Sequence, residues 1–120
     1  MITLEQINET YVISFYNVSR FDVLICNTVK KQILQLIESK NTRVLIDLKG
    51  IRFIDSNGFK AFETITRQVQ RKKAVLRYCS LSDDVKELIN LMQVFDAFTV
   101  CNREEFIAEK KPVKERMFAF

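Results

Sequence analysis

The 120-residue sequence predicts an α/β domain in which helices cover a largely parallel sheet. Short runs rich in β-branched and aromatic residues alternate along the chain with longer stretches of helical periodicity. The run from Val44 to Leu48 is almost continuously apolar, which is typical of a parallel strand that is buried on both faces. Only two Gly and one Pro are present, so few loops are expected to be long or irregular.

The first part of the chain is predicted to form a hairpin followed by a helix. Residues 2–7 and 11–16 have the composition of strands, and an intervening Asn-Glu-Thr segment can turn between them. The loop after the hairpin ends in Asp22, whose carboxylate is expected to accept hydrogen bonds from the first turn of a helix. An apolar stripe predicts that this helix runs from residue 23 to about residue 39.

The rest of the chain alternates regularly between strands and helices. In order, the patterns predict strand 43–48, helix 57–71, strand 74–79, a helix capped by Ser82, strand 98–101 and a helix capped by Asn102. Pro112 is expected to end the last helix. We therefore expect one domain over residues 1–111, with the order β-β-α-β-α-β-α-β-α, and a C-terminal tail over residues 112–120.

Composition and patterning argue against several classes of protein. No apolar run approaches the roughly 20 residues that span a bilayer, and the N-terminus lacks the pattern of a signal peptide. We therefore expect a cytoplasmic protein with no membrane insertion. The chain has no His, and its three cysteines, Cys26, Cys79 and Cys101, are far apart. The usual residues of zinc, haem and Ser-His-Asp sites are thus missing, so we expect buried thiols and no cofactor.

The net charge of +4 reflects a local excess of basic residues near the end of the predicted helix 57–71. This cluster consists of Arg67, Arg71, Lys72, Lys73 and Arg77. Cations at a helix C-terminus complement the helix dipole, which gives the cluster a structural explanation. No aromatic residue interleaves the cluster as a base-stacking surface would require, so we expect no direct binding of nucleic acid.

The segment 51–60 joins the most apolar strand to a helix, and it is the main candidate for a functional site. Free N–H groups at a helix start favour an anion or a phosphorylated side chain. Asp47 and Asp55 suggest acid–base chemistry, and Asp47 suggests a receiver domain, but neither a third polar group nor a second acidic pair accompanies them. Ser56 could be a phosphoacceptor, and Ser56 or Asn57 could equally be a helix cap. Spacing alone leaves phosphoacceptor and cap open.

The stretch Val44-Leu45-Ile46-Asp47-Leu48-Lys49-Gly50-Ile51-Arg52-Phe53-Ile54-Asp55-Ser56-Asn57-Gly58 resembles the signature of STAS domains, the family of bacterial anti-sigma factor antagonists. Ser19-Arg20-Phe21-Asp22 is similar to the "GRLD" entry to the first helix of that family, and residues 97–108 are similar to its closing segment. The resemblance spans roughly residues 2–110. It implies a STAS fold, with a four- to five-stranded mixed sheet and about four helices packed on it.

The same resemblance implies a partner-switching regulator rather than an enzyme. Such a protein binds an anti-sigma factor, which is often a serine kinase of the histidine-kinase-like ATPase fold. The kinase phosphorylates the Ser that follows the Asp of the motif, and a phosphatase resets it. By position the phosphorylated residue is Ser56. The residues expected to bind the partner are Asp55, Asn57, Gly58, Lys60 and Asp22.

The motif also departs from the family pattern. Asn57 replaces a small residue after the acceptor, and Phe59-Lys60 replaces Leu-Gly. Lys60 places a long cation where a partner would dock. This departure and the aromatic residues of the tail favour an alternative, a STAS adaptor or scaffold subunit of a signalling or transport complex that is not phosphorylated. An enzyme or ligand-binding domain of similar α/β form is the third hypothesis.

Overall fold

A computed structural model describes residues 2–39, 41–94 and 97–109. The elements follow in the order β1 (Ile2–Ile7), β2 (Thr10–Phe15), β3 (Arg20–Phe21), α1 (Cys26–Leu36), β4 (Arg43–Asp47), β5 (Phe53–Ile54), α2 (Ser56–Lys72), β6 (Val75–Cys79), α3 (Asp83–Met92) and α4 (Arg103–Ala108).

Four strands form the main sheet in the order β1-β2-β4-β6. β1 is antiparallel to β2 with Ile2 opposite Phe15, whereas β4 is parallel to both β2 and β6. This arrangement confirms the predicted mixed sheet with an antiparallel N-terminal strand. All five residues of β4 are buried, as the apolar run predicted.

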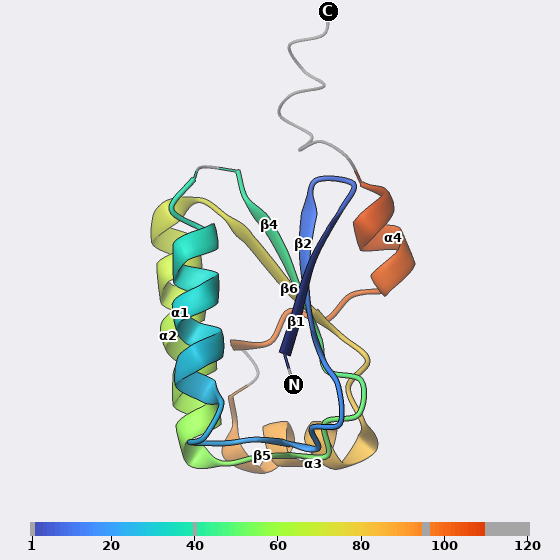
Figure 1. The fold of residues 1–120 in the computed structure, drawn as a ribbon. Helices are drawn as coiled ribbons and strands as arrows, with labels where there is room; N and C mark the ends of the chain where they lie inside the picture. The colour runs from blue at the N-terminus through green and yellow to red at the C-terminus, as the bar shows by residue number, and fades with distance from the viewer. Residues whose placement is uncertain (1, 40, 95–96, 110–120) are drawn as a thin grey trace, which may run out of the picture.

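Helices cover both faces of this sheet. α1 and α2 lie side by side on one face, and the short helix α4 packs on the other (Figure 1). β4 serves both layers because its side chains alternate. Val44 and Ile46 belong to the large core, whereas Leu45 belongs to a smaller cluster with Phe106 of α4.

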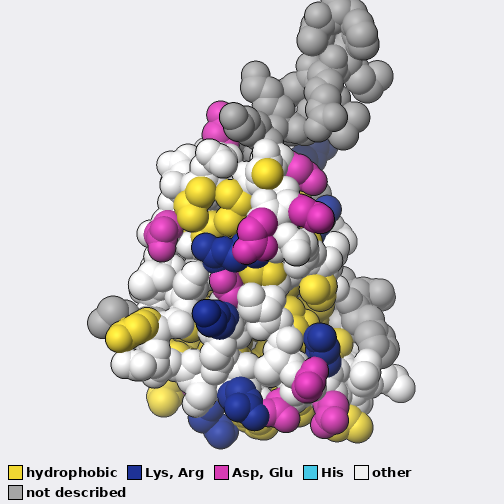
Figure 2. Space-filling view, turned by 90° about the vertical axis from the view of Figure 1, so that its right-hand side faces the viewer, with side chains coloured by type: hydrophobic (Ala, Val, Ile, Leu, Met, Phe, Trp, Pro, Cys, Tyr) yellow, Lys and Arg dark blue, Asp and Glu magenta, His cyan; other side chains and the backbone are white. Residues whose placement is uncertain are grey.

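Side chains from the two ends of β4 hold α4 on the sheet. Asp47, the last residue of β4, forms an ion pair of 2.5 Å with Arg103 at the start of the helix. Arg43, the first residue of β4, is buried with its guanidinium 3.9 Å from the centre of the Phe106 ring. The same guanidinium donates to the Phe106 carbonyl at 2.8 Å and pairs with Glu109 at 3.3 Å. On the α4 side of the domain, charged side chains of both signs are interspersed with small hydrophobic patches (Figure 2).

One predicted helix start is wrong by three residues, and another differs by one. α1 begins at Cys26 rather than at residue 23, because the Asp22 carbonyl accepts the N–H groups of Ile25 and Cys26 and closes a turn first. α2 begins at Ser56, one residue before the predicted start at Asn57.

The predicted strand over residues 98–101 is reduced to a single parallel bridge between Tyr78 and Val100. Thr66 of α2 donates to the Ala97 carbonyl at 3.1 Å, and this bond holds the preceding chain against α2. Only the end of the segment therefore follows β6. There the backbone N–H of Tyr78 donates to the Thr99 carbonyl, and the Tyr78 carbonyl accepts from the Cys101 N–H, both at 2.9 Å.

A second small sheet was not predicted. β3 pairs in parallel with β5, with Arg20 opposite Phe53 and Phe21 opposite Ile54. Both strands have only two residues, and the sequence prediction placed both segments in loops. This pairing brings the chain before α1 next to the chain before α2.

The predicted tail, residues 112–120, lies outside the described residues. Within residues 2–39, 41–94 and 97–109, no helix is long and apolar enough to cross a membrane.

Candidate functional site

The candidate site lies at the start of α2, and Asp55 creates that start. Asp55 has an extended backbone, and its Oδ1 accepts a hydrogen bond of 2.8 Å from the Gly58 N–H. It is therefore the helix cap. The alternative in which Ser56 or Asn57 is the cap is wrong. Ser56 is the exposed first residue of α2, and its hydroxyl makes no hydrogen bond with any described residue.

Asp55 also links the two helix starts. Its Oδ2 accepts from the Val23 N–H at 3.3 Å, and its own N–H donates to the Phe21 carbonyl at 3.2 Å. One side chain thus fastens the beginning of α2 to the turn that leads into α1. Because the β3–β5 pairing supports the same junction, the backbone around Ser56 is held from two sides.

Asp22 shapes the neighbouring turn instead of capping α1. Its Oδ1 accepts from the Leu24 N–H at 3.0 Å, and Arg20 lies 3.7 Å from its other oxygen. The N-cap position of α1 is occupied by Ile25, which makes no side-chain capping bond. The predicted capping role of Asp22 is therefore wrong, although the residue does lie in the turn beside Asp55.

Gly58 is buried against β3 and cannot offer a side chain to a partner. A Cβ at this position would lie 2.5 Å from the Phe21 carbonyl oxygen and 2.8 Å from Ile54 Cγ2. Real Cβ atoms essentially never come that close to other atoms, so only glycine allows α2 to approach β3 at this distance.

Asn57 and Lys60 are exposed and line a groove of about 160 Å³ between α1 and α2. From the other side, α1 contributes Asn27 and Lys30 to the same groove. The structure therefore brings two predicted residues, Asn57 and Lys60, together with a cation that sequence reasoning missed. Lys30 carried no signal of its own, because its role depends on how α1 packs beside α2.

Cys26 is buried at the base of this groove. Burial raises the pKa of its thiol, the Asp55 carboxylate raises it further, and Lys30 acts in the opposite direction. The thiol therefore stays protonated at neutral pH, and it experiences charges from both Asp55 and Lys30.

The two carboxylates of the acid–base hypothesis have separate structural roles. Asp47 binds Arg103 through one oxygen and accepts from the Lys49 N–H at 3.0 Å through the other. Asp55 uses both oxygens for the contacts described above. No group of three acidic or cysteine side chains arranged to hold a metal ion occurs in the described ranges.

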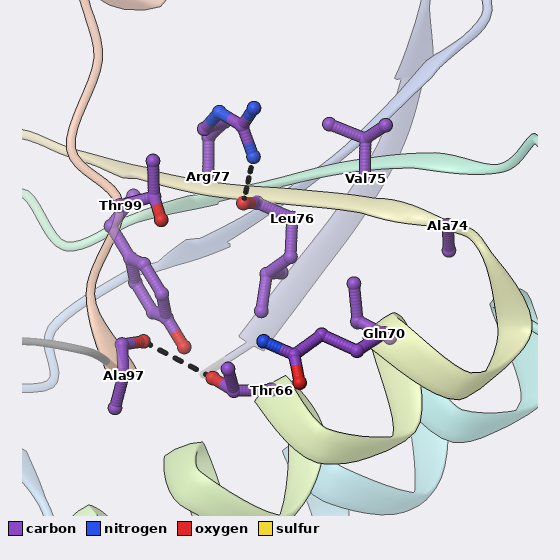
Figure 3. Close-up of a pocket in the computed structure, with 10 residues that line it drawn as sticks. Thr66, Gln70, Ala74, Val75, Leu76, Arg77, Ala97 and Thr99 are labelled. Atoms are coloured by element: carbon purple, nitrogen blue, oxygen red, sulfur yellow. Dashed lines mark hydrogen bonds between the residues drawn. The ribbon is translucent and has the colours of Figure 1, made fainter.

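A separate cavity of about 220 Å³ opens at the edge of β6, away from the predicted site residues (Figure 3). Thr66 donates across it to the Ala97 carbonyl, and Arg77 donates to the Leu76 carbonyl at 2.8 Å. The Tyr78 hydroxyl is buried beside Thr66 without the geometry of a hydrogen bond, and burial raises the pKa of Tyr78. This cavity contains none of the predicted partner-binding residues, and Arg77 is the one member of the predicted basic cluster that lines it.

Solved structures with the same fold include two related to sigma-factor regulation. An anti-sigma-factor antagonist (STAS) domain protein from Planctomyces limnophilus has 20% identity, a TM-score of 0.74 and coverage of 89% of this chain and 96% of that one. The phosphorylated form of the Bacillus cell fate determinant SpoIIAA has 16% identity, a TM-score of 0.65 and coverage of 89% and 96%.

The same fold also occurs in a transport context. A sulfate transporter family protein from Wolinella succinogenes has 14% identity, a TM-score of 0.68 and coverage of 83% of each chain. No curated protein matches the sequence. At these identities the structural similarity establishes the fold, and it confirms the predicted STAS architecture. The sequence model of the STAS domain matches residues 2–107, nearly the whole length of the chain, and this chain therefore belongs to the STAS domain family.

Proposed function

We propose that this chain is a partner-switching regulator of the anti-sigma factor antagonist type, controlled by phosphorylation of Ser56. The unmodified form binds an anti-sigma factor that is itself a serine kinase of the histidine-kinase-like ATPase fold. Phosphorylation by that kinase ends the complex, and a phosphatase restores the unmodified form.

The observation that supports this proposal is that Asp55 caps α2 while the Ser56 side chain is exposed. Asp55 satisfies the helix start, so the exposed Ser56 hydroxyl is not needed to cap α2. A phosphoryl group would add roughly two negative charges at this point. Because Asp55 fastens the surrounding backbone, the change would act on the surface presented to a partner rather than on the fold.

The surroundings of Ser56 suit the docking of a protein. The turn before α1 exposes two apolar side chains, with Leu24 83% and Val23 55% exposed. Asn57 and Lys60 lie exposed on the neighbouring turn of α2. A mixed surface of apolar, amide and cationic groups is typical of a protein-binding site. The P. limnophilus protein is named as an antagonist of this type, and SpoIIAA has a phosphorylated form, which supports the assignment.

The test is phosphorylation by an anti-sigma factor of the serine kinase type that binds this chain. Purified protein is incubated with that kinase and ATP, and the modified peptide is identified by mass spectrometry. We expect phosphate on Ser56, none on the Ser56→Ala variant, and normal modification of a Ser39→Ala control at an exposed serine after α1. Calorimetry should show that the partner binds the unmodified chain and not the phosphorylated chain.

The alternative of a non-phosphorylated adaptor or scaffold rests on Lys60 and on the transporter relative. Lys60 places a cation one turn beyond Ser56, and a protein of the sulfate transporter family shares the fold. If Ser56 stays unmodified and Ser56→Ala retains full partner binding and full function in the cell, the adaptor hypothesis replaces the switch.

A further inference from the structure

We infer that Lys30 and Lys60 form a seat that binds the phosphoryl group on Ser56, so that phosphorylation neutralises a cationic groove instead of leaving an isolated anion on the surface. This inference rests on the proposed function, because it concerns the phosphorylated form of the same serine. It goes beyond that function by naming the side chains that receive the phosphate and the charge that the partner encounters in each state.

The position of Lys60 on α2 places it beside Ser56. Residues four apart on a helix have Cβ atoms about 5–6 Å from each other on the same face. Long helical side chains also lean toward the N-terminus, so Lys60 lies over the turn that contains Ser56. Both residues are exposed, and no side chain has to leave the core for a contact to form.

Lys30 lies on the neighbouring helix and lines the groove that begins at Asn57, the residue after Ser56. It lines the groove opposite Lys60, with the amides of Asn27 and Asn57 between the helices. The Cys26 thiol, one turn before Lys30 on α1, lies close enough to the start of α2 for the Asp55 carboxylate to raise its pKa. The two lysines therefore converge on one groove from different helices.

Both lysines are available for a new ligand. Among the residues that the structure describes, neither Lys30 nor Lys60 has an acidic partner within 4.0 Å. Asp55 keeps its negative charge, but its oxygens accept from the Val23 and Gly58 N–H groups and it forms no ion pair with either lysine. Glu63 of α2 does not line the groove. Two cations without ion-pair partners about a shallow groove are suited to a dianion with several acceptor oxygens.

The charge of the site indicates which form of the protein an acidic partner prefers. The two lysines carry two positive charges, and a phosphate with a charge between about −1.5 and −2 would nearly offset them. The charge of Asp55 is the same in both states. The unmodified site is then the more cationic form, and it favours a partner that presents carboxylates. Phosphorylation removes that attraction by occupying the same lysines.

The decisive experiment installs phosphoserine at position 56 by amber suppression, which requires no kinase. The second pKa of the phosphate is measured by ³¹P NMR in the intact chain and in a synthetic phosphopeptide covering residues 52–60. Two exposed ion pairs should lower the second pKa in the intact chain by about 0.5 to 1 pH unit. Each single variant, Lys30→Gln and Lys60→Gln, should lose part of this difference, and the double variant most of it.

Lys31→Gln is the matched control. Lys31 is an exposed residue of α1 next to Lys30, but it does not line the groove, so its removal tests for a general effect of net charge. The helix start of α2 also lowers the pKa of a phosphate, but it is unchanged in all four variants. The seat is refuted if the second pKa is the same in the double variant, the control and the unsubstituted chain.

The pKa experiment tests the lysine site separately from the kinase experiment, which tests the proposed function. A lysine-dependent pKa with no kinase acting on Ser56 would support the seat and count against the switch. Kinase modification of Ser56 with a pKa that ignores both lysines would retain the switch and overturn the seat.

Discussion

Replacing Gly58 with alanine tests how closely α2 approaches β3. At an ordinary helical position this change is favourable, because alanine exceeds glycine in helix propensity by up to about 1 kcal/mol. Here the added methyl group would lie 2.5 Å from the Phe21 carbonyl oxygen, 2.8 Å from Phe21 Cδ1 and 2.8 Å from Ile54 Cγ2. The carbonyl belongs to the backbone of β3 and cannot rotate away, so the start of α2 must shift.

The loss of unfolding free energy in Gly58→Ala has three contributions. Overpacking of a buried position costs about 1–3 kcal/mol, and the shift also strains the 2.8 Å hydrogen bond between the Gly58 N–H and Asp55. The gain in helix propensity offsets about 1 kcal/mol of this. The net loss of unfolding free energy should be about 1–2 kcal/mol, equivalent to a decrease in melting temperature of about 4 °C or more.

Urea denaturation followed by far-UV circular dichroism measures this loss as a lower midpoint at constant slope. Asn57→Ala is the control, because it introduces alanine at the preceding position, where the side chain is exposed. We expect that control to be neutral or stabilising. If Gly58→Ala is as stable as the unsubstituted chain, the close approach of α2 to β3 is not what requires glycine.

Three further predictions concern single side chains. Asp55→Ala should lower the unfolding free energy by about 1–3 kcal/mol in urea denaturation, and Asp55→Asn by less, because an amide retains one acceptor for the cap. Arg43→Lys should lose the stack on the Phe106 ring and destabilise the protein by about 1–2 kcal/mol, with faster hydrogen exchange confined to α4. Burial raises the pKa of Cys79 to about 11 from 9.0, so the unfolded state loses its thiol proton first, and about 2–3 kcal/mol of stability should disappear between pH 9 and 11. Cys79→Ala should flatten that decline in a pH series of thermal melts, and an equally steep decline in the variant would contradict the reasoning.

Features governed by local chemistry were predictable from the sequence. The apolar run of β4 indicated a strand covered on both faces, and the structure buries all of it. The two predicted caps are confirmed, since Ser82 accepts from the Val85 N–H at 3.2 Å and Asn102 accepts from the Glu105 N–H at 3.0 Å. Asn102 lies between Cys101 and Arg103, so no neighbouring side chain competes for the cap. Ser82 is followed by Asp83 and Asp84, whose carboxylates suit the first turn of a helix.

The residue that caps α2 was harder to predict from the sequence, because Asp55, Ser56 and Asn57 are consecutive residues with similar capping ability. Local preference ranks them almost equally. The choice depends on the tertiary contact from Asp55 to the Val23 N–H, 32 residues away in sequence. Asp22 failed as a helix cap for a related reason, because its carbonyl group closes a turn before α1 can begin.

The β3–β5 pair and the groove could not be predicted from one sequence. A strand of two residues is too short to show alternation, so Arg20–Phe21 looked like any loop. The groove exists only because α1 and α2 pack together, and no spacing within either helix brings Lys30 to Lys60. Motif resemblance identified the serine, while three-dimensional packing supplied its surroundings.

The contacts that Arg43 and Asp47 make with α4 fix where the described chain ends relative to Ser56. Arg43 begins β4 and contacts Glu109, the last described residue, whereas Ser56 follows the opposite end of that strand (Figure 1). An attachment point at Glu109 is therefore at the end of the domain opposite the start of α2 (Figure 1). Kinase access and partner binding can be measured on protein immobilised through that end, with the Lys30–Lys60 groove facing the solution.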